Sequence, residues 1–226
     1  MVAPAPYPVT AQKPTTNFTA TDRVAVGKIK IFAFIGIIGI ILGLIVPFSA
    51  GGMGYMFAFG TTPTGVGTAV IAAVALGVIG FAVGIYAILK LRSALKDLST
   101  IDKGFSTPAT LVLAGLVGFG FLILAFLLLI GGLAVAINGV TSALGLLLGA
   151  LALFALGGLA AFVGIIGIIL GLWKAGERYD NTLVKVGGIL YIIPFVDIVA
   201  PILVFLGARE IEGKLSSSAG STSSGP

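Results

Sequence analysis

The sequence alternates between long apolar runs and short polar stretches. Four runs are long enough to cross about 30 Å of hydrocarbon at a helical rise of about 1.5 Å per residue. They cover residues 31–50, 68–89, 110–137 and 144–173. A fifth run, residues 186–208, has the length of a crossing but is interrupted by Pro194, Asp197 and Pro201. The pattern predicts an all-α, polytopic transmembrane bundle of four clear spans plus a fifth that is broken or kinked.

The fifth run allows two paths. A kinked crossing would carry the C-terminal tail to the side opposite the N-terminus. A re-entrant pair of half-helices, about residues 183–193 and 198–214, would return the tail to the N-terminal side. These half-helices would be buried against the bundle, where protein or water satisfies the backbone carbonyls freed at the break. Two basic residues near the end favour the second path, but two glutamates balance them, so we expect the kinked crossing. These residues are Arg209, Lys214, Glu210 and Glu212. Both paths predict a helix break between residues 193 and 198, with Asp197 facing protein rather than lipid.

The two ends of the chain lack apolar periodicity. Residues 1–22 are rich in Pro and Thr, which predicts a flexible N-terminal tail. Residues 212–226 are rich in Ser and Gly, which predicts a disordered C-terminal tail. The bundle is therefore expected to span residues 23–211.

The basic residues are distributed unevenly between the polar stretches. Eleven of the thirteen Lys and Arg residues precede the first run, separate the second from the third, or follow the fourth. The stretches 51–67 and 138–143 contain none. Because basic residues mark cytoplasmic loops, we expect a multi-pass protein of the cell membrane with a cytoplasmic N-terminus.

A glycine-rich segment occurs twice. FIGIIGIILGL at residues 34–44 and FVGIIGIILGL at residues 162–172 differ at one position, and residues 77–84 repeat the glycine spacing. Glycines at i, i+3 and i+7 share one helical face and allow a neighbouring backbone to approach closely. They predict helix packing within the bundle, or alternatively self-association, through Gly36, Gly39, Gly43, Gly77, Gly80, Gly84, Gly164, Gly167 and Gly171.

Composition limits the chemistry. The chain is 58% hydrophobic and 9% charged, and it has neither histidine nor cysteine. The apolar cores of the first four runs hold no carboxylate pair, Lys or Arg. We therefore expect no enzyme, no catalytic or cofactor-binding residues, no metal site and no cofactor. The net charge of +5 reflects topology, so nucleic acid is not an expected partner.

Asp197 is the one charge inside a candidate span, which makes it a candidate functional residue together with Pro194 and Pro201. Two interpretations stay open. Asp197 caps a new helix that begins at Ile198 and has Pro201 in its first turn, or it binds an ion or substrate. The first is the one that we favour.

Two segments resemble a known family. GERYDNTLVKVGGILYIIPFVDIVAPILVFLGAREI at residues 176–211 and LRSALKDLSTIDKGFSTPATL at residues 91–111 are similar to uncharacterised archaeal multi-pass membrane proteins, known as domain of unknown function 973. The resemblance implies an archaeal membrane and four to five helices, and it implies no activity.

These observations favour a structural or accessory membrane protein, such as a complex subunit or scaffold. Its expected partners are the lipid bilayer and either other membrane proteins or further copies of itself. The alternative is a small channel or transporter that uses the broken segment around Asp197.

Overall fold

A computed structural model describes residues 18–58, 63–136, 140–193 and 198–220, and it gives only the backbone course of residues 42–58, 63–77, 130, 133–134, 136, 140–142 and 218–220. Within this part of the chain every element is helical, and the predicted all-α bundle is confirmed. The elements are α1 (Ala20–Ala58), α2 (Pro63–Ile101), the 3-10 helix η1 (Lys103–Phe105), α3 (Ser106–Ala136), α4 (Val140–Arg178), α5 (Thr182–Leu190) and α6 (Ala200–Gly220).

Four of the described helices, α1 to α4, contain stretches long and apolar enough to cross a membrane. Each of these helices contains nearly all of one predicted run and is longer than that run. One difference is at the turn between α1 and α2, where most of the predicted polar stretch 51–67 is helical. The glycines there remain helical because backbone groups near lipid must find hydrogen bonds within the chain.

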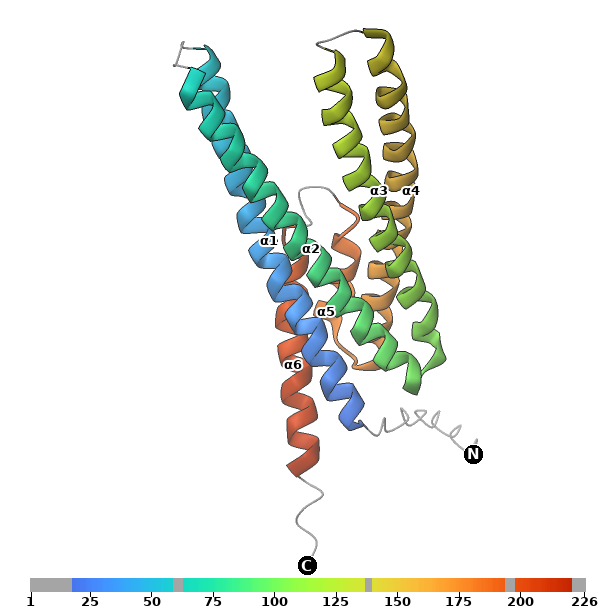
Figure 1. The fold of residues 1–226 in the computed structure, drawn as a ribbon. Helices are drawn as coiled ribbons and strands as arrows, with labels where there is room; N and C mark the ends of the chain where they lie inside the picture. The colour runs from blue at the N-terminus through green and yellow to red at the C-terminus, as the bar shows by residue number, and fades with distance from the viewer. Residues whose placement is uncertain (1–17, 59–62, 137–139, 194–197, 221–226) are drawn as a thin grey trace, which may run out of the picture.

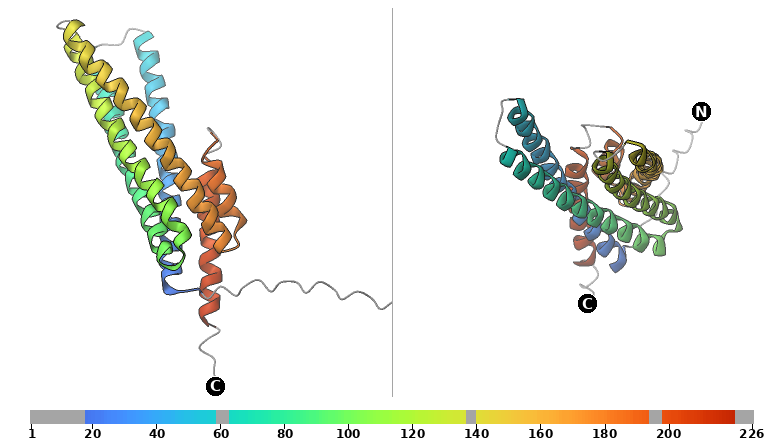
Figure 2. Two further views of the ribbon diagram at one scale, coloured as in Figure 1. Left: turned by 90° about the vertical axis from the view of Figure 1, so that its right-hand side faces the viewer. Right: turned by 45° about the horizontal axis from the view of Figure 1, so that its top comes forward.

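The long helices form two antiparallel pairs, which we call the α1–α2 arm and the α3–α4 arm. In Figures 1 and 2 the arms meet at one end, where α5 and α6 also lie, and separate towards the other. Both described ends of the chain lie at the end where the arms meet.

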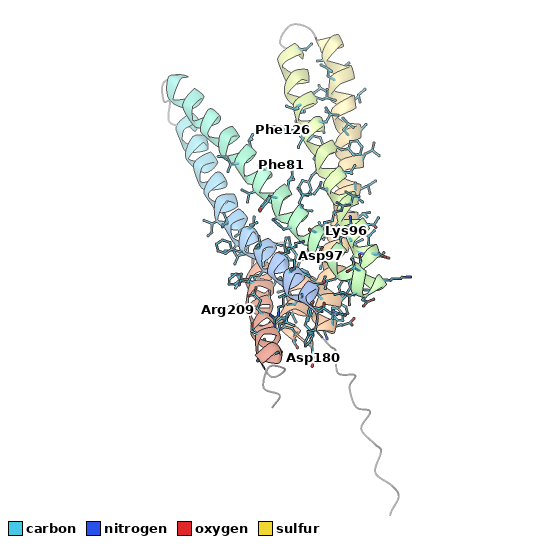
Figure 3. The ribbon with its side chains drawn as sticks, turned by 60° about the horizontal axis from the view of Figure 1, so that its bottom comes forward. Phe81, Lys96, Asp97, Phe126, Asp180 and Arg209 are labelled. Atoms are coloured by element: carbon cyan, nitrogen blue, oxygen red, sulfur yellow. The ribbon has the colours of Figure 1, made fainter. Side chains whose placement is uncertain are left out.

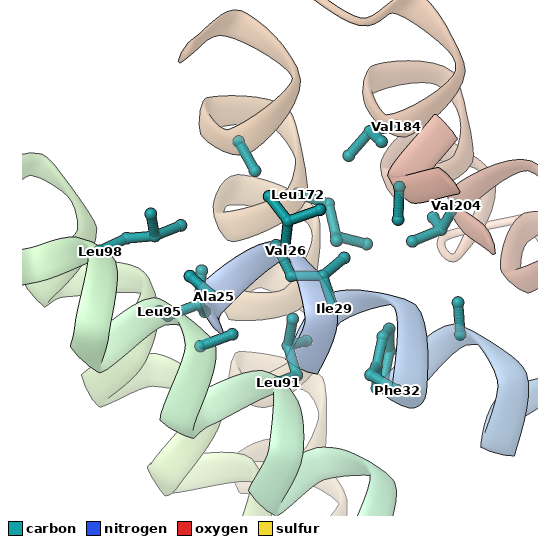
Figure 4. Close-up of a cluster of buried hydrophobic side chains, with 14 of the residues drawn as sticks. Ala25, Val26, Ile29, Phe32, Leu91, Leu95, Leu98, Leu172, Val184 and Val204 are labelled. Atoms are coloured by element: carbon teal, nitrogen blue, oxygen red, sulfur yellow. The ribbon is translucent and has the colours of Figure 1, made fainter. Parts of the chain in front are cut away.

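A hydrophobic core joins the arms where they meet. Leu91, Leu95 and Leu98 of α2 have no exposed surface, because spacing of three and four residues places them on one face. That face packs against α1, and Leu95 also lies beside Gly171 of α4. Figure 4 shows these leucines in one buried cluster with Leu172 of α4 and, across α1, Val184 and Val204. Removing one of these side chains would cost about 2–5 kcal/mol.

The fifth run forms a helical hairpin, so the expected kinked crossing is wrong. A Cβ added at Gly187 of α5 would lie 2.7 Å from Val204 Cγ2 of α6, and one at Gly207 would lie 2.6 Å from Asn181 Oδ1. The end of α5 is therefore beside the start of α6, and the two helices run in opposite directions. Small residues permit this close approach, which lets each half-helix bury the other.

The hairpin returns α6 to the polar end of α1. The ring of Phe34 in α1 lies 6.1 Å from that of Phe205 in α6, centre to centre. Nearer the C-terminus, Arg23 donates a hydrogen bond to the carbonyl oxygen of Leu215 at 2.9 Å. α6 continues to Gly220, past the expected limit of the bundle at residue 211, because Leu215 is buried against this surface.

Candidate functional site

Charged side chains gather at the end where the arms meet, and we call this group the polar base. Figure 3 shows Lys96, Asp97, Asp180 and Arg209 in this part of the molecule, away from Phe81 and Phe126. The residues of the polar base that make described contacts are Thr19, Asp22, Arg23, Lys28, Lys30, Ser93, Asp97, Lys174, Arg178, Tyr179, Asn181, Glu210, Glu212 and Lys214.

Asp22 is fully buried at the centre of the polar base. Its Oδ1 accepts hydrogen bonds from Arg178 Nε and from the Tyr179 hydroxyl, both at 2.9 Å. Its Oδ2 accepts from the backbone N–H and the hydroxyl of Thr19, at 2.8 and 2.9 Å. Both oxygens are thus occupied, as a buried carboxylate requires.

Local sequence explains this geometry. Thr19 precedes α1, and Asp22 is the third residue of the helix, the spacing of a capping box. The Asp22 N–H donates back to the Thr19 hydroxyl at 3.3 Å. The same carboxylate then ties the start of α1 to the end of α4 through Arg178.

Burial raises the pKa of Tyr179 well above its usual value, and the nearby charge of Asp22 raises it further. The hydroxyl therefore remains protonated and acts as a hydrogen-bond donor to Asp22. The Tyr179 ring also packs against Phe18, with ring centres 6.0 Å apart. Tyr179 is a structural anchor in this arrangement.

Two further ion pairs connect α1 to its neighbours. Lys28 bonds to both Asp97 and Ser93 of α2. Lys30 pairs with Glu212 of α6. These side chains are about one quarter to one third exposed, so each pair contributes on the order of 0–1 kcal/mol.

The turn from α4 to α5 uses Asp180 in the left-handed region, with φ of 49°, a conformation that Asp tolerates better than most residues. Asn181 then caps α5, since its side-chain oxygen accepts from the Val184 N–H at 3.0 Å. Its Nδ2 donates to Glu210 of α6 at 3.0 Å. The hydrogen bond and charge of Lys214 lower the pKa of Glu210, which stays ionised.

Of the three residues in the predicted candidate site, the structure describes only Pro201. Pro194 and Asp197 lie outside the described residues. Pro201 is buried in the first turn of α6, where its missing N–H has no helical partner to lose. α6 begins at Ala200, two residues later than the capping interpretation of Asp197 expects.

The predicted packing glycines of α4 lie in a seam against α3 and α2. A Cβ at Gly164 would overlap Gly115 of α3, and one at Gly167 would lie 2.6 Å from the Val112 nitrogen. One at Gly171 would lie 2.7 Å from Leu95 Cδ1 of α2. Gly164 and Gly167 face backbone atoms and admit only glycine at the present helix separation, whereas Gly171 faces the end of the Leu95 side chain.

The equivalent glycines of the α1–α2 arm have different surroundings. A Cβ at Gly36 would lie 3.1 Å from Pro201 Cβ. At Gly39, Gly80 and Gly84 it would meet no described atom within 4 Å. The side-chain surroundings of Gly43 and Gly77 lie outside the described residues.

Sequence reasoning missed the cluster around Asp22, although a signal was present. Thr19-Ala-Thr-Asp22 before an apolar run matches the capping-box pattern. Its link to Arg178 and Tyr179, some 157 residues away, has no local signal. Among the described residues, no three acidic side chains come together as a metal site would require.

Residues 22–226 match a family described as "Protein of unknown function (DUF973)", and the chain belongs to that family. No curated protein and no solved structure matches the chain.

Proposed function

We propose that this family member is a structural or accessory protein of the archaeal cell membrane, whose α1–α2 arm packs against a helix of another membrane protein or of a second copy. One observation carries the proposal. The segment that packs against α3 in α4 recurs almost unchanged in α1, where Gly39 has no described atom within 4 Å of an added Cβ. In lipid, a glycine face of this kind gains its contacts from a neighbouring helix.

The polar base supports a structural role rather than a catalytic one. Its buried carboxylate is bonded on both oxygens, and its hydroxyl and guanidinium partners are used to hold α1 against α4. A catalytic carboxylate needs a free oxygen for a substrate proton. The proposal therefore includes no catalysis and no cofactor.

Copurification tests this function. After mild detergent extraction, the wild-type chain should retain a partner or a second copy in fixed stoichiometry. The double variant Gly39→Leu and Gly80→Leu should fold but lose it. Gly120→Leu is the matched control, because an added Cβ there also meets no described atom within 4 Å but lies on the other arm. A wild-type chain that copurifies with nothing, itself included, would contradict the proposal.

The proposed orientation places the polar base in the cytoplasm, and the distribution of Lys and Arg supports it. The chain has no cysteine, so single cysteines are clean reporters. Thr64→Cys should react with an impermeant maleimide from outside, whereas Ser99→Cys and Ser217→Cys should not. Reaction of Ser99→Cys in intact cells would reverse the orientation.

A channel or transporter is the second candidate, and the α5–α6 hairpin favours it. Paired half-helices that end within the bundle are a common way to build a solute or ion site. This function predicts ion or solute flux in liposomes that Asp197→Asn abolishes. Flux that is absent, or that Asp197→Asn leaves unchanged, would remove this candidate.

A further inference from the structure

The two arms touch along a seam between α2 and α3. The rings of Phe81 in α2 and Phe119 in α3 meet edge to face, 5.4 Å apart. Below them, Ile88 and Val112 line a cavity of about 20 Å³. These contacts establish which face of α2 is directed towards α3.

Arg92 belongs to that face, because it follows Ile88 by four residues, one helical turn. Its Nε is buried and has no hydrogen-bond partner among the described residues. α3 offers no charged acceptor to Arg92, since the sequence of α3 contains no acidic residue. The carboxylate of nearby Asp97 is bonded to Lys28 of α1.

A buried guanidinium N–H without an acceptor is costly, and the cost is relieved when an anion binds. Lys96, one turn further along α2, is exposed and adds a second positive charge on this side of the helix. Arg92 and Lys96 therefore make an electropositive site at the lower end of the seam.

The site lies where phosphate groups of a bilayer are expected. Tyr86, six residues before Arg92, and Lys90, two residues before it, form a cation–π pair with the Lys90 Nζ 5.1 Å from the centre of the Tyr86 ring. Such amphipathic side chains occupy the headgroup boundary. Leu89 of α2, at the level of these side chains, and Ile123 of α3, one turn beyond the Phe81–Phe119 pair, expose 42% and 38% of their surfaces, so the apolar wall of the seam runs from the cations towards Ile123.

We propose that the α2–α3 seam binds one anionic phospholipid. The phosphate accepts hydrogen bonds from Arg92 and is attracted by Lys96, and the chains lie along the apolar wall towards Ile123. Arginine suits the phosphate because its planar fork makes two parallel hydrogen bonds. The continuity of charge below and apolar surface above selects a lipid over free phosphate, which would leave the wall uncovered.

Native mass spectrometry of the protein from lipid nanodiscs tests the headgroup. Phosphatidylglycerol should be retained in preference to phosphatidylcholine, and Arg92→Gln should weaken that retention about tenfold, the scale of one charged hydrogen bond. Lys103→Gln is the control, because it removes an exposed cation from η1 and should leave retention unchanged. Equal retention of the two lipids by the wild-type chain would overturn the proposal.

Fluorescence quenching tests the position of the acyl chains of the lipid. It does not use Arg92→Gln, so it remains informative if that variant fails to fold. The chain has one tryptophan, so Ile123→Trp in a Trp173→Phe background reports on the seam. Phosphatidylglycerol with brominated chains should quench this reporter more than brominated phosphatidylcholine does, and Lys96→Gln should reduce the difference. Equal quenching would contradict the proposal. Protection of the site by millimolar inorganic phosphate alone would identify a free-anion site and overturn the lipid assignment.

Discussion

The two copies of the glycine repeat have nearly the same sequence and opposite surroundings. In α4, residues 162–172 are pressed against α3 and α2, and Gly167 faces a backbone nitrogen. In α1, residues 34–44 touch α6 at Gly36, and no described atom lies within 4 Å of a Cβ at Gly39. The motif therefore permits close packing without specifying it, and the neighbouring helix decides the outcome.

The neighbour of α4 explains the difference. α3 carries Gly115 and Gly118 opposite Gly164 and Ala161, so small residues on both helices meet in one seam. On the other arm, an added Cβ at Gly39 of α1 or at Gly84 of α2 meets no described atom within 4 Å, so these glycines do not meet in a comparable seam. A close contact in lipid needs small residues on both sides.

The largest predicted effect separates the two copies directly. Gly167→Leu should destabilise the chain by about 4 kcal/mol or more, because the new side chain must displace backbone and not only side chains. Gly39→Leu should change the unfolding free energy by less than about 0.5 kcal/mol in detergent, as expected for a surface position. Unfolding in mixed micelles measures both. Equal destabilisation would mean that the copies have the same role.

The polar base joins α1 and α4, the helices that carry the two copies of the glycine repeat. Breaking the buried pair Asp22–Arg178 there should have the second-largest effect on the unfolding free energy. Arg178→Met removes the guanidinium and leaves the Asp22 carboxylate buried beside Tyr179, which should cost about 3 kcal/mol. Lys28→Met breaks a partly exposed pair and should cost under about 1 kcal/mol. The same unfolding measurement applies. A larger loss for Lys28→Met would place the main attachment of α1 on α2 and not on α4.

A smaller effect is expected at the start of α1. Thr19→Ala removes the hydroxyl that bonds Asp22 and should cost about 1 kcal/mol, the usual value of a helix cap. Thr21→Ala, two residues later and with no described side-chain hydrogen bond, serves as the control. If both variants unfold alike, the capping box does not contribute to holding α1 in place.

The smallest effect concerns alkaline pH. Because the folded pKa of Tyr179 is raised above its unfolded value of about 10, its contribution to stability is constant below about pH 10 and is lost as pH rises above it. Tyr179→Phe should be less stable than wild type at pH 8 and should lose less stability between pH 9 and pH 11. Parallel pH profiles for the two proteins would show that Tyr179 ionises freely.

Hydrophobic runs predicted the four long helices, because length and apolarity alone decide a crossing. The path of the fifth run depends on contacts between α5 and α6 and at the polar base, which the length and apolarity of a run do not indicate. Arg209 and Lys214 favour the re-entrant path but are a weak signal beside Glu210 and Glu212, whereas in the structure Lys214 and Asn181 both bond Glu210 at the polar base. The small residues Gly187 and Gly207, which let α5 and α6 pack, are the stronger signal.

The candidate site was less accessible to sequence reasoning. Asp22 falls within the predicted flexible tail, because its burial depends on Arg178 and Tyr179 at the far end of the chain. Distant contacts of this kind leave no periodicity in the sequence. Asp197 is the one charge within the fifth apolar run, and its role stays a prediction.

Photo-cross-linking in native membranes gives the most direct test of an open glycine face on the α1–α2 arm. A benzophenone attached to Gly39→Cys should form a discrete adduct with one protein, whereas the same group on Gly120→Cys or Gly158→Cys of the other arm should form adducts with lipid only. All three positions are equivalent in the isolated chain, since a Cβ at each meets no described atom within 4 Å. Lipid adducts alone at Gly39→Cys, or the same protein adduct at all three positions, would contradict the account.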